Sequence, residues 1–243
     1  MQQLYRLLKT IILVVFLSLS LINVNILGQN IDKSTTEFPD AMNPYDWRLS
    51  LGYASIKMPT DVYLEAAAVR FPLFKFAAVM GLPSNFLLDG KISTELVTNQ
   101  FELGARWVYD IDNNLHLDVG YSFAYLYGQL KQFAYDSKIS GWFSYPSAAL
   151  GYDFGNLALT FRGGFSFINS LQSTSGSTTV DFALARGNGF YYRITLEQRF
   201  YKNTTVGIGF QMNYVKFYYP EWLMFPTFDR KYWIPELQIM FSI

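Results

Sequence analysis

The chain has 243 residues, a formal net charge of +0 and no cysteine. Balanced charge gives a nucleic-acid partner no electrostatic support, and the lack of cysteine excludes disulfide bonds, iron–sulfur clusters and thiolate metal sites. Aromatic residues make up 19% of the chain, whereas the mean hydropathy is only +0.11. The mean hydropathy is low for a bundle of membrane helices. Many aromatic residues together with a modest mean hydropathy are typical of membrane strands that alternate apolar and polar residues.

Residues 1–28 have the pattern of a secretory signal peptide. A positively charged start precedes an apolar run over 11–27, and Gly28 is a small residue at the expected cleavage point. The run is close to the length of a membrane-spanning helix, so an uncleaved anchor is the alternative. Serine and asparagine residues within the run favour cleavage. We therefore expect an exported chain, cleaved near Gly28, with a flexible periplasmic leader over residues 29–45.

From residue 46 onward, apolar and polar residues alternate with a period of two. Leu115 and Leu117, for example, alternate with His116 and Asp118. This period predicts strands with one apolar face. The pattern predicts about ten strands, at residues 46–57, 62–76, 85–97, 100–110, 115–128, 142–154, 157–168, 189–200, 205–216 and 232–243. Eight strands is the alternative count, because residues 58–84 do not alternate cleanly.

The connections between these strands alternate in length. Short ones are predicted at residues 111–114, 155–156 and 201–204, and long ones at 129–141, 169–188 and 217–231. A soluble β-sandwich also alternates, but its outward positions would be polar, whereas Tyr, Trp and Phe recur here on the apolar face. Closing a barrel leaves no backbone edge facing lipid. The predicted fold is all-β, a transmembrane antiparallel β-barrel over residues 46–243 with short periplasmic turns and long extracellular loops.

With this pattern, the whole mature chain resembles Gram-negative outer-membrane β-barrel proteins, although no specific family is identified. The resemblance includes a final amphipathic strand, "YWIPELQIMFSI". It implies residence in the outer membrane, contact with outer-membrane lipid, and recognition of the C-terminal strand by the barrel-assembly machinery. The chain departs from the usual terminal aromatic residue, because it ends on Ile243 with Phe241 two places earlier.

Charged residues recur on the polar faces, which a barrel turns toward its lumen. Buried charges need partners, so these residues are predicted to form a lumen network of Arg48, Glu102, Arg106, Asp118, Arg162, Arg193, Glu197, Arg199 and Glu236, with Lys91 and Glu95 as further members. Turn lengths set the register. The predicted register places Arg106 opposite Asp118 and in contact with it. It also pairs Arg162 with Ala149, Arg199 with Gly207, and Glu197 with Gly209.

The network either fills the lumen as a structural element or lines a narrow channel. The predicted function is a non-enzymatic channel or portal for small solutes or apolar ligands. The alternative is a scaffold or binding barrel that presents loops or joins an envelope complex through a protein partner. A barrel hydrolase is a third hypothesis, with His116 and Asp118 as base and orienting acid, but no nucleophile lies near them. No catalytic, metal or cofactor site is predicted.

Two of the long loops differ in composition. Residues 169–189 are rich in Ser, Thr and Gly, which predicts a flexible loop. The loop before the last strand is instead strongly apolar, and such a patch usually marks a contact. We expect it to be ordered, as a lid on the barrel or as a contact site, through Tyr218, Tyr219, Trp222, Leu223, Met224, Phe225 and Phe228.

Overall fold

The computed structural model describes residues 37–59, 70–95, 97–132, 135–176, 178–181, 187–201, 204–221 and 230–242. All of them belong to one compact unit, Lys33–Ile243. Predictions for the signal peptide, for residues 60–69 and for residues 222–229 lie outside the described residues. In the described part of the chain, no helix has both the length and the apolar character needed to cross a membrane.

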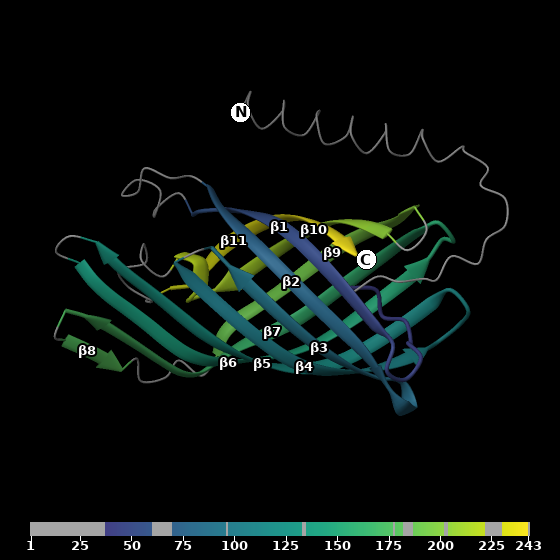
Figure 1. Ribbon diagram of the computed structural model, residues 1–243, viewed down its shortest axis with the longest axis horizontal. Coiled ribbons are helices and arrows are strands. Elements are labelled where there is room, and N and C mark those ends of the chain that lie inside the picture. Colours follow the sequence, from purple (N-terminus) through teal and green to yellow (C-terminus); the bar gives the residue numbers. More distant parts are fainter. Residues whose placement is uncertain are drawn as a thin grey trace, which may run out of the picture. The chain divides into compact units, whose positions relative to one another are not determined.

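Ten strands form a closed antiparallel barrel, which confirms the predicted fold class and the higher of the two strand counts. They are β1 (Trp47–Lys57), β2 (Arg70–Leu82), β3 (Phe86–Thr94), β4 (Thr98–Asp110), β5 (Leu115–Gln132), β6 (Tyr135–Asp153), β7 (Leu157–Ser175), β9 (Gly187–Tyr201), β10 (Thr204–Val215) and β11 (Tyr232–Ser242). Each barrel strand pairs with the next, and β11 pairs with β1 to close the ring (Figure 1). Closure leaves no sheet edge to face lipid.

The two ends of the barrel differ. At one end, which we call the short-turn end, the 3-10 segment η2 (Pro83–Asn85) and the connections 111–114 and 154–156 join neighbouring strands. At the other, the long-hairpin end, β5 and β6 project as a long hairpin, and β7 continues into a hairpin with the short strand β8 (Thr178–Asp181) (Figure 1). A second 3-10 segment, η3 (Tyr219–Glu221), follows β10 at this end.

The predicted long loop over 129–141 is wrong, because β5 continues to Gln132 and β6 begins at Tyr135. Similarly, β7 extends seven residues beyond its predicted end at 168, to Ser175. Polar residues occupy both faces of these extensions, so the alternation that predicts a strand fades before the strand ends. β2 also lies further along the chain than predicted, and it runs to Leu82 rather than 76.

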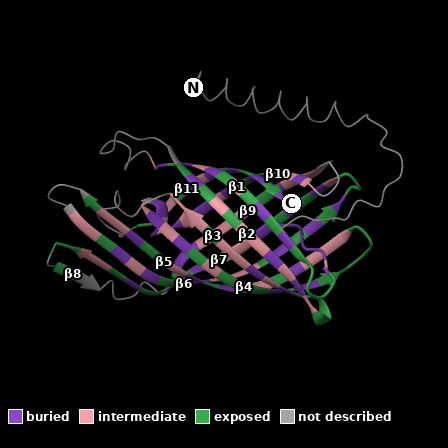
Figure 2. Cartoon of the chain, in the orientation of Figure 1, coloured by how far each residue is buried: buried purple, intermediate pink, exposed green. Residues whose placement is uncertain are grey.

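Burial alternates along each strand in a sense opposite to that of a soluble protein (Figure 2). On β4, Phe101, Leu103 and Trp107 are exposed by 49%, 61% and 44%, whereas Gln100 and Arg106 are exposed by only 6% and 5%. Large apolar side chains cover the outside, and polar or charged ones fill the inside. Such an exterior is stable only in apolar surroundings, as the hydrocarbon core of a bilayer provides.

Candidate functional site

The N-terminal segment 37–42, which we call the plug, lies inside the barrel at the short-turn end. Glu37, Phe38, Asp40 and Met42 are all at most 8% exposed. The Asp40 carboxylate accepts two hydrogen bonds from the Arg48 guanidinium, at 2.6 and 3.0 Å. The prediction of a flexible leader therefore does not hold for residues 37–42, because their side chains are held by buried contacts.

The plug also packs against the barrel wall. Its apolar side forms a buried cluster at the short-turn end, made of Met42, Val79, Leu87 and Val108. The Phe38 ring meets the His116 ring edge to face, with centroids 5.2 Å apart. Gly151 makes room for the segment, because a Cβ at that position would lie 2.5 Å from Pro39 Cδ and 2.7 Å from Phe38 Cε2.

The lumen holds a buried ion network around Asp118, which is 0% exposed. Arg106 Nη1 lies 3.1 Å from Asp118 Oδ2, and Arg162 binds both carboxylate oxygens at 3.0 and 2.6 Å. Arg106 also contacts Asp89 at 3.3 Å. The predicted contact between Arg106 and Asp118 is thus present. The Asp118 carboxylate is shared by the guanidiniums of Arg106 and Arg162, and the Asp89 carboxylate supplies the second negative charge that balances them.

The register that motivated this contact is wrong by two residues. Arg106 lies opposite Gly120, and Asp118 lies opposite Val108. The turn is wider than predicted, because the Ile111 and Asp112 amides both donate to the Leu115 carbonyl. A shift of two preserves the inward face, so the contact forms diagonally. Gly120 accommodates it, since a Cβ there would lie 2.6 Å from Arg106 Cγ.

Of the other predicted pairings, one is correct and two are shifted by two residues. Arg162 lies opposite Ala149, as predicted. Glu197 lies opposite Gly207 rather than Gly209, and Arg199 opposite Thr205 rather than Gly207. Glu197 is 2% exposed, so both shifts keep the predicted face.

The remaining predicted network residues also pair within the lumen, and two of these pairs connect to the contacts around Asp118, through Lys91 with Asp89 and through Glu37 with Arg162. Arg48 binds Asp40, Glu102 lies 3.8 Å from Lys91, Arg193 lies 2.7 Å from Glu37, Arg199 lies 3.8 Å from Asp153, and Glu236 pairs with Lys75. Glu95 lies just after β3 at the long-hairpin end, and one of its carboxylate oxygens is buried with no hydrogen-bond partner among the described residues. The network is therefore layered along the barrel rather than concentrated in one site.

The sequence prediction missed five partners in this network: Glu37, Asp40, Lys75, Asp89 and Asp153. A signal existed for three of them. Lys75 alternates with Phe74 and Phe76, Asp153 alternates with Tyr152 and Phe154, and Asp89 lies two residues before Lys91, on the same face of its strand. The plug residues carry no such signal, because their segment has no period.

Aromatic residues after β10 lie buried in the lumen at the long-hairpin end. Phe217 and Tyr218 are 2% and 7% exposed, and with Tyr219 they form what we call the cap. Phe217 stacks on Phe143, with centroids 5.6 Å apart. The Asn188 side chain fixes the backbone of Phe217, because its amide donates to the Phe217 carbonyl and its oxygen accepts from the Phe217 N–H, both at 2.8 Å.

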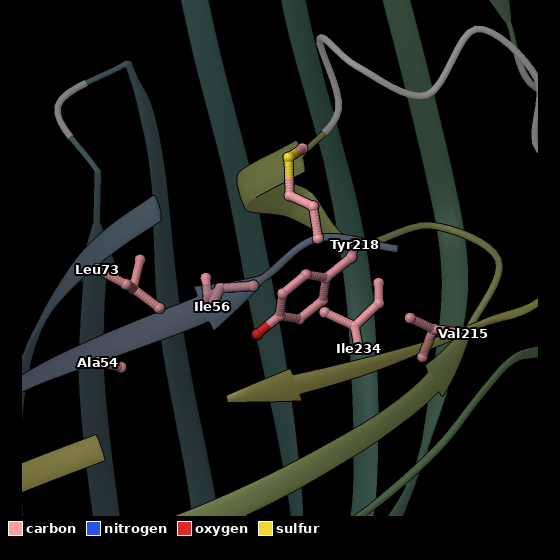
Figure 3. Close-up of a cluster of buried hydrophobic side chains, with 7 residues drawn as sticks. Ala54, Ile56, Leu73, Val215, Tyr218 and Ile234 are labelled. Carbon is pink, nitrogen blue, oxygen red and sulfur yellow. The ribbon is translucent and has the colours of Figure 1, made fainter. Parts of the chain in front are cut away.

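Tyr218 lies among Ile56, Val215 and Ile234 in a buried cluster (Figure 3). Its hydroxyl reaches into the polar part of the lumen, where it donates to Glu236 at 2.6 Å. Two members of the predicted aromatic loop, Tyr218 and Tyr219, thus lie in the barrel. The others, Trp222, Leu223, Met224, Phe225 and Phe228, lie outside the described residues.

Between the plug and the cap lies a partly open chamber with a cavity volume of about 110 Å³. Glu37 borders it at one end, and the three cap residues border it at the other. Its charged lining is balanced, with three cations and three carboxylates: Lys75, Lys91, Arg193, Glu37, Glu102 and Glu236. Amide, hydroxyl and aromatic groups complete the walls, so the chamber offers hydrogen bonds and ring faces to a polar molecule of modest size.

The geometry does not assemble the hypothetical hydrolase pair. His116 Nδ1 lies 2.5 Å from Asp110 Oδ1, whereas Asp118 is engaged by two arginines. The Ser122 hydroxyl donates to Glu102 at 2.7 Å. Across the ranges that the structure describes, no group of three or more His, Asp and Glu side chains is arranged to hold a metal ion.

No protein-family model matches the sequence, and no curated protein sequence matches it. Solved structures with a similar chain path include the translocator domain of the autotransporter NalP from Neisseria meningitidis, with a TM-score of 0.44 at 8% identity over 87% of this chain and 90% of that one. The porin NanC has a TM-score of 0.43 at 7% identity, over 82% and 99% of the two chains. Neisserial surface protein A has a TM-score of 0.38 at 11% identity, over 81% and 96%.

Likenesses this distant carry no argument about activity. The fold rests on the chain itself, in which ten strands close into a ring with apolar side chains outside and charged ones inside. The chain is therefore a transmembrane β-barrel of the outer-membrane type.

Proposed function

We propose that this protein is a gated, non-enzymatic passage for small polar solutes in a Gram-negative outer membrane. The observation that carries the proposal is the polar chamber of about 110 Å³ between the plug and the cap. In barrels of about this size side chains commonly fill the interior, so a space left between the two segments supports a passage over a scaffold. The balanced lining favours a polar solute over an apolar one.

Buried side chains narrow the passage toward both ends. Phe38 and Met42 lie at the short-turn end, and Phe217 and Tyr218 lie at the other. Transport would require the plug or the cap to move. The plug is the better candidate for the moving part, because it is a segment outside the barrel's hydrogen-bonded sheet, held by side-chain contacts.

The location and partners belong to the same proposal. The apolar outer surface supports contact with outer-membrane lipid. The N-terminal sequence supports export with cleavage near Gly28, and the final amphipathic strand supports recognition by the barrel-assembly machinery. An envelope protein partner is the alternative reading of the aromatic loop.

Planar-bilayer conductance of the Gly151→Ala variant tests the passage. The added methyl would clash with Pro39 and Phe38, so it should displace the plug without removing any charge. We expect conductance several-fold above that of the unaltered protein. The matched control is Gly163→Ala, where the nearest atom to an added Cβ is 4.0 Å away; this variant should behave like the unaltered protein. If Gly151→Ala folds and stays as silent as the control, the scaffold alternative is favoured.

A further inference from the structure

Glu37 is held in the lumen as a bound carboxylate ligand would be. It belongs to the plug, whereas the cations around it belong to the barrel wall. Its Oε1 accepts a hydrogen bond from Arg193 Nη1 at 2.7 Å, and its Oε2 lies 3.7 Å from Arg162 Nε. Burial alone would raise the pKa of Glu37, but Arg193, Lys91 and Arg162 outweigh it and hold that pKa well below the usual range.

Two of the wall cations, Arg193 and Arg162, are not fully satisfied without this carboxylate. Arg193 donates its Nε to the neutral amide of Gln211 at 2.7 Å, and its acidic partner is Glu37. The acid paired with Arg162 on its other side, Asp118, is already shared with Arg106. Arg162 Nε is buried and has no hydrogen-bond acceptor among the described residues. Removing Glu37 would thus leave a buried, positively charged site.

This site opens toward the chamber. Glu37 and Arg193 both line it, so a molecule inside the chamber meets the cation that contacts Glu37 at 2.7 Å. Lys91 also lines the chamber, where it lies 3.8 Å from both Asp89 and Glu102. Exchange of one carboxylate for another keeps the ion pairs and avoids leaving a buried charge alone. The exchange would release one of the two acidic anchors of the plug, leaving the pair of Asp40 with Arg48.

We propose that Arg193 and Arg162 form a carboxylate-binding site that Glu37 occupies in the closed state, and that a small carboxylate entering the chamber displaces Glu37 and loosens the plug. This inference rests on the proposed passage and names its solute class as anionic carboxylates.

The test compares two variants that each remove one plug charge, Glu37→Gln and Asp40→Asn. Succinate is the probe, and chloride at equal ionic strength is the reference. Succinate should raise the thermal midpoint of Glu37→Gln by about 3 °C or more, because a ligand that binds only the folded state stabilises it. Asp40→Asn keeps Glu37 in the site, so its midpoint should shift much less. The inference is overturned if succinate moves neither variant, or moves both equally.

Backbone hydrogen exchange in the unaltered protein gives a second measurement should Glu37→Gln fail to fold. Succinate should speed exchange at residues 37–42 several-fold relative to chloride, since the displaced plug loses its protection. Unchanged exchange at saturating succinate would contradict the inference. Bilayer conductance separates the two proposals. If the barrel binds succinate but never conducts, the carboxylate-binding site stands and the proposed passage is rejected. If the barrel conducts but does not respond to succinate, only the carboxylate-binding site is rejected.

Discussion

At the scale of single residues, Asp118 is the hub of the lumen. It is fully buried and is the shared acid of Arg106 and Arg162. Asp118→Ala would leave both guanidiniums short of a partner, and breaking such a buried pair costs about 3–5 kcal/mol. We expect the free energy of unfolding, measured by urea titration in lipid vesicles, to fall by that amount.

The control for this substitution is Asp110→Ala. Asp110 also pairs with a neighbouring side chain, His116, but its own side chain is 48% exposed. Exposed pairs contribute about 0–1 kcal/mol, so this variant should unfold close to the unaltered protein. Equal losses in the two variants would count against a hub at Asp118.

Glu95 gives the stability a pH dependence at the same scale. Burial raises the pKa of its carboxyl to about 8, while a hydrogen bond from Thr98 acts in the opposite direction. A carboxyl whose folded pKa lies above its unfolded pKa contributes stability below the unfolded pKa and loses it as pH rises through the folded pKa. Stability should therefore fall between about pH 5 and about pH 9. Glu95→Gln stays neutral and should flatten this part of the profile; an unchanged slope would assign the dependence to other groups.

At the scale of elements, the strands were predictable from the sequence and their register was only partly so. Alternation places each side chain on a face. Where the observed register differs from the predicted one it does so by two residues, which leaves Arg106, Glu197 and Arg199 inside the barrel. The turn itself decides the register, and four polar residues such as 111–114 fit more than one turn geometry. The sequence therefore determines which residues meet in the lumen better than it determines their direct neighbours.

The junction between β10 and the cap depends on one side chain from β9. Asn188→Ala would leave the buried N–H and C=O of Phe217 without their partners, at a cost of about 1–3 kcal/mol. We expect the Phe217 amide to exchange with solvent much faster while the barrel stays folded, as measured by hydrogen exchange with mass spectrometry.

Ser166→Ala is the matched control, because it removes the other hydrogen-bond partner of the Asn188 amide, at 3.0 Å, and leaves both bonds to Phe217 in place. Its exchange at Phe217 should change little. If the two variants exchange alike, the cap is held by the stacking on Phe143 rather than by Asn188.

At the scale of the whole molecule, the closed ring should make the folded protein resist detergent. Its backbone groups pair around the ring, so sodium dodecyl sulfate alone should not unfold it. Unboiled samples should migrate differently on a gel from boiled ones, and circular dichroism should show a β spectrum. A strongly helical spectrum would contradict the fold.

The fold as a whole was within reach of sequence reasoning because lipid outside and water or charge inside impose a period of two on every strand. The plug was not. Residues 37–42 have no period, and their conformation comes from contacts with residues far along the chain, such as Arg162 and Arg193. A local sequence pattern does not indicate contacts with residues so far along the chain.

The plug also dictates an order of assembly. Glu37 meets Arg193 across 156 positions of sequence, and the cavity between them exists only after β11 has joined β1. Contacts between distant parts of a chain form late in folding. A newly inserted barrel therefore passes through a stage in which the ring is complete and its short-turn end is still empty, so that only the cap stands across the lumen until the N-terminal segment of the same copy enters it.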